Sequence, residues 1–169
     1  KSIRTMIRMI NKGQVVGMFP EGGRSIDGSP LPILKETLKL IQRCKVPILP
    51  IHLDGAYEIW PRWAPNRRHG RVTATISPII PVEDQTNLIE LEQKISQTIF
   101  SDKKVFKQVT SRSITSGMDH LLWACYKCHT HNSILELTGS SLKCSHCGTV
   151  WNVADDYTLT ETGVAYSLT

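Results

Sequence analysis

Apolar residues recur at three- and four-residue intervals in three stretches of the chain, residues 3–12, 33–44 and 88–99. This spacing places the apolar side chains on one face of a helix. Gly13 is placed to end the first of these helices. We therefore predict three amphipathic helices whose apolar faces pack against a sheet.

Shorter apolar runs between these stretches predict strands. The run at 15–19 stops at Pro20, which lacks the N–H that continued pairing needs, and this predicts a buried strand. Apolar and polar residues alternate over 72–76, as in a half-buried strand. Two prolines limit the run at 48–53 to an edge strand or an irregular extended segment. The alternation of strands and helices predicts an α/β fold with a mixed sheet covered by helices.

Changes in composition divide the chain into four parts. The first carries the helix and strand patterns, the second is rich in Lys, Ser and Thr without periodicity, and the third contains paired cysteines. We predict an α/β domain over 1–100, a linker over 101–118, a small β module over 119–155, and a tail or the start of a further segment over 156–169.

The excess positive charge lies in the first two parts. Residues 1–110 carry 17 Lys and Arg against 10 Asp and Glu, whereas residues 111–169 carry 3 against 5. A basic surface suits anionic lipid headgroups, acyl coenzyme A or nucleic acid, so the sign of the charge does not choose among these partners.

A glycine pair between two charges follows the first predicted strand, in the sequence FPEGGRS at 19–25. Gly22 and Gly23 permit close approach of a ligand to the backbone, and the guanidinium of Arg24 matches phosphate or carboxylate oxygens. Glu21 adds an acceptor beside them. A plain Gly-Gly turn with a solvated Glu/Arg pair is the alternative for this motif taken alone.

The sequence VPILPI at 46–51 follows FPEGGRS after one predicted helix, and together they resemble the third and fourth sequence blocks of the glycerolipid acyltransferases. This family includes lysophosphatidic acid and glycerol-3-phosphate acyltransferases, and the resemblance covers residues 1–100. It implies transfer of a fatty acyl group from acyl-CoA or acyl carrier protein to the free hydroxyl of 1-acylglycerol 3-phosphate, in phospholipid biosynthesis. It further implies peripheral contact with a membrane surface, at its cytoplasmic face.

The same resemblance implies roles for the loop residues. Glu21, Gly22 and Arg24 would bind the glycerophospholipid precursor, with Arg24 on its phosphate. Gly23 lies in the same acceptor loop, where the family usually has Thr, so this chain lacks a hydroxyl and a methyl group there.

The family's catalytic pair, a His followed five positions later by an Asp, has no match in this chain. The residues five positions after the six histidines are Tyr57, Ala74, Cys125, Ile134, Glu136 and Trp151. We therefore expect the pair upstream of Lys1, in a longer protein of which this chain is a part and without which it is inactive. The alternative is a non-catalytic homologue that binds a lipid or a protein.

Two Cys-x2-Cys pairs, Cys125 with Cys128 and Cys144 with Cys147, are separated by 15 residues. This spacing is typical of a structural zinc site with four thiolates, here in a zinc ribbon with Gly148 in the second turn. Two disulfides are the alternative. The ribbon is net acidic, which argues against nucleic acid and favours a structural role or a protein partner.

Overall fold

The computed structural model describes residues 2–100, 108–161 and 164–166. The chain divides into two compact units. Unit 1 consists of Lys1–Arg24, Pro30–His52 and Ala74–Ser101, and unit 2 consists of Ser25–Ser29, Leu53–Thr73 and Asp102–Thr169. Each unit has its own core of buried apolar side chains, and each is described here by itself.

The helices of unit 1 are those that the apolar spacing predicts. They are α1 (Ser2–Asn11), α2 (Lys35–Cys44) and α4 (Leu88–Ile99), and a short 3-10 helix, η1 (Val82–Gln85), precedes α4. Gly13 follows α1 with a φ of 74°, a left-handed conformation that glycine adopts without strain. The side chain of Asn87 caps α4 by accepting a hydrogen bond from the backbone N–H of Ile89 at 2.9 Å. The positions of the three predicted helices are confirmed.

The core of unit 1 lies where α2 and α4 pack against each other. An antiparallel bridge between Ile48 and Ile80 borders it, and the buried amide of Gln85 donates hydrogen bonds to the carbonyls of Val46 and Ile80. The buried residues of this core are Ile33, Leu38, Ile80, Leu91 and Ile95.

The predicted strand over 15–19 is wrong. These residues pair with no strand among the described residues, and the side chains of Val15 and Phe19 are 97% and 74% exposed. A strand needs a neighbour to accept its backbone hydrogen bonds, and apolar composition alone does not supply one. A second correction concerns β2 (Thr73–Ile76), which does form a strand beside β1 (Ile51–Asp54) but is exposed along its length rather than half-buried.

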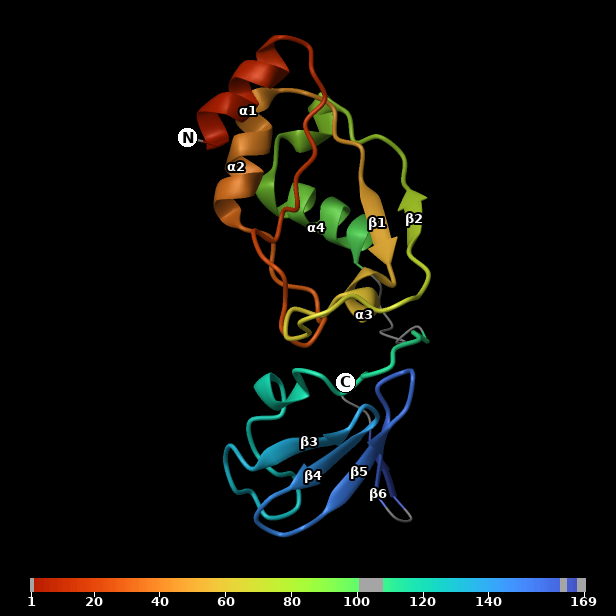
Figure 1. The fold of residues 1–169 in the computed structure, drawn as a ribbon. Coiled ribbons are helices and arrows are strands. Elements are labelled where there is room, and N and C mark those ends of the chain that lie inside the picture. Colours follow the sequence, from red (N-terminus) through yellow and green to blue (C-terminus); the bar gives the residue numbers. More distant parts are fainter. Residues whose placement is uncertain (1, 101–107, 162–163, 167–169) are drawn as a thin grey trace. The chain divides into compact units, whose positions relative to one another are not determined.

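The chain therefore mixes helices and strands as predicted, with a separate sheet in the region of the predicted small β module. In the described residues before that module, a two-stranded sheet replaces the mixed sheet that we expected. β1 and β2 form a two-stranded sheet, and the remaining five strands form a separate antiparallel sheet in unit 2. That larger sheet follows sequence order, so each strand pairs with the next along the chain (Figure 1). Its strands are β3 (Ile134–Thr138), β4 (Ser141–Cys144), β5 (Val150–Val153), β6 (Leu159–Glu161) and β7 (Val164–Tyr166).

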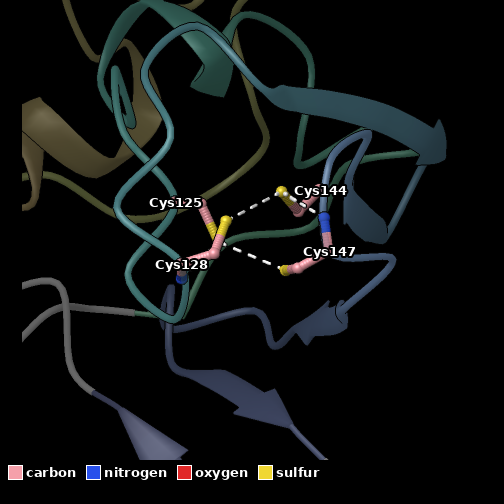
Figure 2. Close-up of side chains that lie close together, drawn as sticks. All are labelled: Cys125, Cys128, Cys144 and Cys147. Carbon is pink, nitrogen blue, oxygen red and sulfur yellow. Dashed lines mark hydrogen bonds between the residues drawn. The ribbon is translucent and has the colours of Figure 1, made fainter.

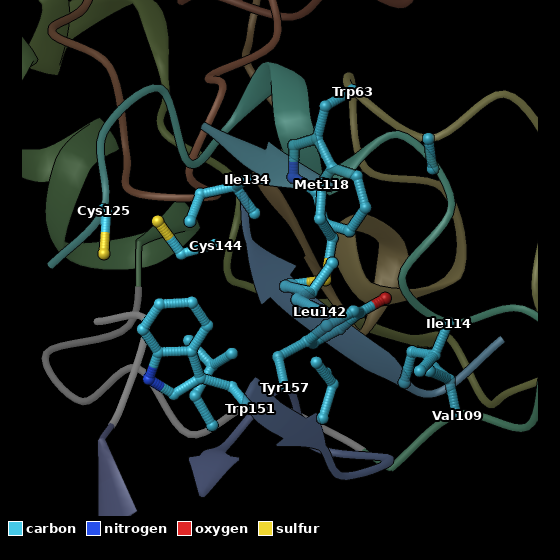
Figure 3. Close-up of a cluster of buried hydrophobic side chains, with 13 residues drawn as sticks. Trp63, Val109, Ile114, Met118, Cys125, Ile134, Leu142, Cys144, Trp151 and Tyr157 are labelled. Carbon is cyan, nitrogen blue, oxygen red and sulfur yellow. The ribbon is translucent and has the colours of Figure 1, made fainter. Parts of the chain in front are cut away.

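Unit 2 also contains the short helix α3 (Ala56–Ile59) and the 3-10 helix η2 (Met118–His120). Its core combines residues from distant parts of the chain (Figure 3). The fully buried members are Tyr157, Met118, Leu142, Cys125 and Cys144.

The described end of the predicted linker, residues 108–118, contributes Val109, Ile114 and Met118 to this core. Residues 101–107 lie outside the described part of the chain. Trp63, from a segment that the sequence analysis placed in the first domain, packs edge-on against Tyr157 with ring centroids 5.9 Å apart. Compact units defined by contacts differ from domains defined by composition, so the predicted domain boundaries stay a prediction.

Candidate functional site

The four cysteines of unit 2 come together from two loops (Figure 2). All four Sγ atoms lie within 4.8 Å of one another, and two Sγ pairs, Cys125 with Cys147 and Cys128 with Cys144, are each 3.7 Å apart. A tetrahedral zinc ion with Zn–S bonds of about 2.3 Å separates its sulfur ligands by about 3.8 Å. The cluster therefore has the size and the donor set of a four-thiolate zinc site.

The two cysteine loops have the same backbone hydrogen bonds. In each, the N–H of the second cysteine points to the Sγ of the first at 3.5 Å, for Cys128 to Cys125 and for Cys147 to Cys144. In each, the residue after the second cysteine also donates its N–H to the carbonyl of the first. That residue is His129 in one loop and Gly148 in the other, and both have a left-handed φ. The prediction that Gly148 serves the second turn is confirmed.

Hydroxyl groups that were not predicted from the sequence also contact the cysteine sulfurs. Thr130 Oγ1 lies 3.3 Å from Cys128 Sγ, and Thr149 Oγ1 lies 3.2 Å from Cys147 Sγ. Each threonine stands two positions after the second cysteine of its pair, in CYKCHT and CSHCGT. This repeat was the available signal in the sequence. Ser133 Oγ, 3.4 Å from the Sγ of Cys144, has no such signal because it comes from another part of the chain.

The surroundings of the thiols differ, and so do their pKa values. Burial raises the pKa of Cys125 to about 12, which favours the protonated thiol in the metal-free protein. Hydrogen bonds from the side chain and backbone of Thr130 lower the pKa of Cys128 to about 5. A bound cation would deprotonate all four thiols, since a coordinating sulfur is a thiolate. Among the described residues, the cluster contains no histidine or carboxylate.

Residues 21–24, the loop that the sequence predicts to bind the acceptor, lie in unit 1. The half-buried carboxylate of Glu21 accepts a hydrogen bond from the backbone N–H of Leu31 at 2.6 Å. The N–H of Leu34 donates to the carbonyl of Pro20 at 3.2 Å. Glu21 thus ties the loop to the segment that leads into α2, and Arg24 lies exposed at its end.

The two glycines of this loop differ in backbone conformation and in the space around them. Gly22 has a φ of 71°, and a Cβ added there would lie 2.5 Å from Leu34 Cδ1. A Cβ on Gly23 would find its nearest neighbour, Leu31 Cδ1, at 4.0 Å, and no positive φ holds that residue. The backbone therefore requires glycine at position 22 but tolerates a side chain at position 23.

Comparisons with known proteins agree with the loop motif. Residues 1–54 match the family model described as acyltransferase. A curated 1-acyl-sn-glycerol-3-phosphate acyltransferase of Limnanthes douglasii is 33% identical over 87 residues, which cover 51% of this chain and 31% of that protein. The protein of the same name from Limnanthes alba matches to the same extent.

A chloroplastic 1-acyl-sn-glycerol-3-phosphate acyltransferase of Brassica napus, BAT2, is 30% identical over 99 residues. That match covers 57% of this chain and 29% of the relative, so the chain spans less than a third of the length of the curated relatives it matches. No solved structure matches the chain.

These matches, together with FPEGGRS and VPILPI, support the glycerolipid acyltransferase family for the first part of the chain. None of the helices in the described part of the chain combines the length and the apolar character that a membrane crossing requires.

Proposed function

We propose that this chain supplies the acceptor-binding part of an enzyme that acylates 1-acylglycerol 3-phosphate in phospholipid biosynthesis. The acyl group would come from acyl-CoA or acyl carrier protein. The observation that carries the proposal is the FPEGGRS loop, which lies within the residues that match the acyltransferase family model. The names of the curated relatives support this acceptor.

In this proposal the loop residues have different roles in binding the acceptor. Arg24 is exposed and carries the planar guanidinium that pairs with two phosphate oxygens at once. Glu21 keeps the loop in place through Leu31, and Gly22 and Gly23 leave the backbone open to the glycerol phosphate. The general base and its Asp partner come from outside this chain, and the reaction takes place at the cytoplasmic face of a membrane that the protein contacts peripherally.

We propose Zn²⁺ as a structural ion held by Cys125, Cys128, Cys144 and Cys147. Four sulfur ligands fill a tetrahedral shell and leave no open position for a substrate, so the ion would stabilise the fold rather than take part in acyl transfer. The exposed side of the ribbon would then serve a protein partner, not a nucleic acid, because residues 111–169 carry 3 basic against 5 acidic side chains.

The test compares Arg24→Ala with Arg43→Ala in the complete natural protein. Arg43 is an exposed arginine near the end of α2 and controls for the loss of one positive charge. We expect Arg24→Ala to lower kcat/KM for 1-acylglycerol 3-phosphate by about a hundredfold, the value of a lost charge-assisted contact, while the KM for the acyl donor stays the same. Arg43→Ala should leave both unchanged.

Equal losses for acceptor and donor in a folded Arg24→Ala protein would contradict the assignment of Arg24. The non-catalytic homologue predicts a different result, in which the natural protein binds 1-acylglycerol 3-phosphate through Arg24 but transfers no acyl group. Reading the gene for a His-x4-Asp block separates the two before any assay.

A further inference from the structure

A basic cavity in unit 2 plays no part in the function proposed above. It has a volume of about 510 Å³, within the range of about 300–1,000 Å³ that is usual for small-molecule sites. Two segments form its walls, and they are fixed to each other because His69 and Thr110 exchange backbone hydrogen bonds of 3.0 and 2.7 Å. Its lining consists of Pro65, Asn66, Arg67, Arg68, His69, Thr110, Ser111, Arg112, Ser113 and Ser116.

All ionisable side chains that line this cavity are basic. Three arginines and a histidine contribute to the lining, and no carboxylate does. Arg67 stacks over the ring of Trp60, with its Cζ 4.5 Å from the ring centroid, which fixes the side chain while leaving its hydrogen-bond donors available. Arg112 is exposed, and its side chain forms no hydrogen bond or ion pair with any described residue.

Arg68 is the least expected member, because its side chain is only 5% exposed. Its Nη2 donates to the carbonyl of Ile114 at 2.7 Å, and its guanidinium lies over the rings of Trp63 and Tyr157. The buried Nε and Nη1 atoms have no hydrogen-bond partner, and no carboxylate in the described part of the chain pairs with this charge.

A buried charge without a counter-ion is costly, and burial lowers the pKa of Arg68 for this reason. Aromatic faces offset part of that cost. Arg68 lines the cavity together with other cations, so its charge adds to the positive potential there.

We propose that this cavity binds a small molecule carrying a phosphate group. Arg68, Arg67 and Arg112 would supply the positive charge, and the hydroxyl groups of Thr110 and Ser116 would supply further donors. Phosphate fits this set because it accepts several charge-assisted hydrogen bonds at once and pairs with arginine through two oxygens. The volume leaves room for an organic group attached to the phosphate.

The experiment measures binding of inorganic phosphate, pyrophosphate and adenosine 3′,5′-bisphosphate to the full chain by calorimetry, with chloride at matched ionic strength as the reference. Arg112→Glu is the test variant, because Arg112 is exposed and the change leaves the core intact. Arg43→Glu on α2 is the control with the same change in charge outside the cavity. We expect Arg112→Glu to weaken binding by at least about tenfold and Arg43→Glu by less than about twofold.

Two further measurements test the proposal. Vesicles containing phosphatidic acid test a lipid headgroup as the source of the phosphate, and binding to these vesicles without binding of any soluble phosphate would overturn the proposal. Equal weakening by Arg112→Glu and Arg43→Glu would also overturn it, since it would show attraction by net charge alone. Because Arg24 is itself proposed to bind phosphate, the Arg112→Glu comparison is repeated in an Arg24→Ala background, where the same loss of binding is expected; disappearance of the Arg112→Glu effect in that background would overturn the proposal.

Discussion

Units 1 and 2 place similar apolar residues in opposite environments. In unit 2, β4 and β5 alternate between buried and outward-facing positions, so that Leu142, Trp151 and Val153 are buried in the shared core. In unit 1, Val15 and Phe19 stand exposed, and no alternation of burial appears along β2. The two regions differ in their strand partners rather than in their hydrophobicity.

The cysteine loops explain much of this difference. They join the start of the module, around Cys125, to the end of β4, around Cys144, and so close a small core around residues that are distant in the sequence. No comparable cross-link ties the FPEGGRS segment to a neighbouring strand among the residues that the structure describes. A metal held by these cysteines, as we propose, would give a small β module the stability that a larger domain obtains from a wide sheet.

If the four cysteines hold zinc as proposed, removal of the ion should have the largest effect on stability, and this effect should fall on unit 2. Structural zinc contributes about 10–16 kcal/mol of apparent folding free energy in zinc-finger peptides. We expect chelation, or the change Cys144→Ser, to abolish the near-ultraviolet circular dichroism of the tryptophans in the unit 2 core. Cys44→Ser is the control, since Cys44 is a half-buried cysteine of α2 outside the cluster.

A chelator without effect, combined with unfolding by a thiol reductant, would instead support the two disulfides. The metal content of the purified chain, measured by mass spectrometry under native conditions, gives the same decision without a variant.

The second prediction compares the loss of stability when a buried apolar side chain of unit 2 is truncated with the loss when an exposed one of unit 1 is truncated. Leu142→Ala removes a side chain with 0% exposure and should cost about 2–5 kcal/mol of unfolding free energy, because it leaves a cavity in the unit 2 core. Phe19→Ala removes one with 74% exposure and should change stability by less than about 0.5 kcal/mol. Denaturant unfolding followed by tryptophan fluorescence measures both. A large loss for Phe19→Ala would show that this residue is buried, as the sequence pattern alone predicts.

The smallest expected effect is a difference in stability between alanine substitutions at the two glycines of the acceptor loop. Gly22→Ala should destabilise unit 1 by about 1–3 kcal/mol, because the residue has a positive φ and its new Cβ would press on Leu34. Gly23→Ala should be neutral within about 0.5 kcal/mol. Thermal unfolding of the two variants provides the comparison, and equal stabilities would mean that the loop relaxes freely around Gly22.

The local pattern of residues was sufficient to predict the helices. The boundaries of α1, α2 and α4 follow from three- and four-residue spacing and from Gly13, since a helix satisfies its hydrogen bonds within its own segment. The FPEGGRS and VPILPI blocks likewise predicted the family whose model matches residues 1–54, and the Cys-x2-Cys spacing predicted which four side chains meet.

Only the tertiary structure decided which apolar segments are buried and which polar groups surround the sites. Val15 and Phe19 look like a core strand in sequence, but burial requires a partner that the pattern does not name. Ser133 beside Cys144, and Arg68 beneath Trp63 and Tyr157, come from distant segments and leave no mark in the local sequence. Helical order is local and can be read along the chain, whereas strand pairing, core packing and the balance of buried charge depend on contacts between segments that only the folded chain brings together.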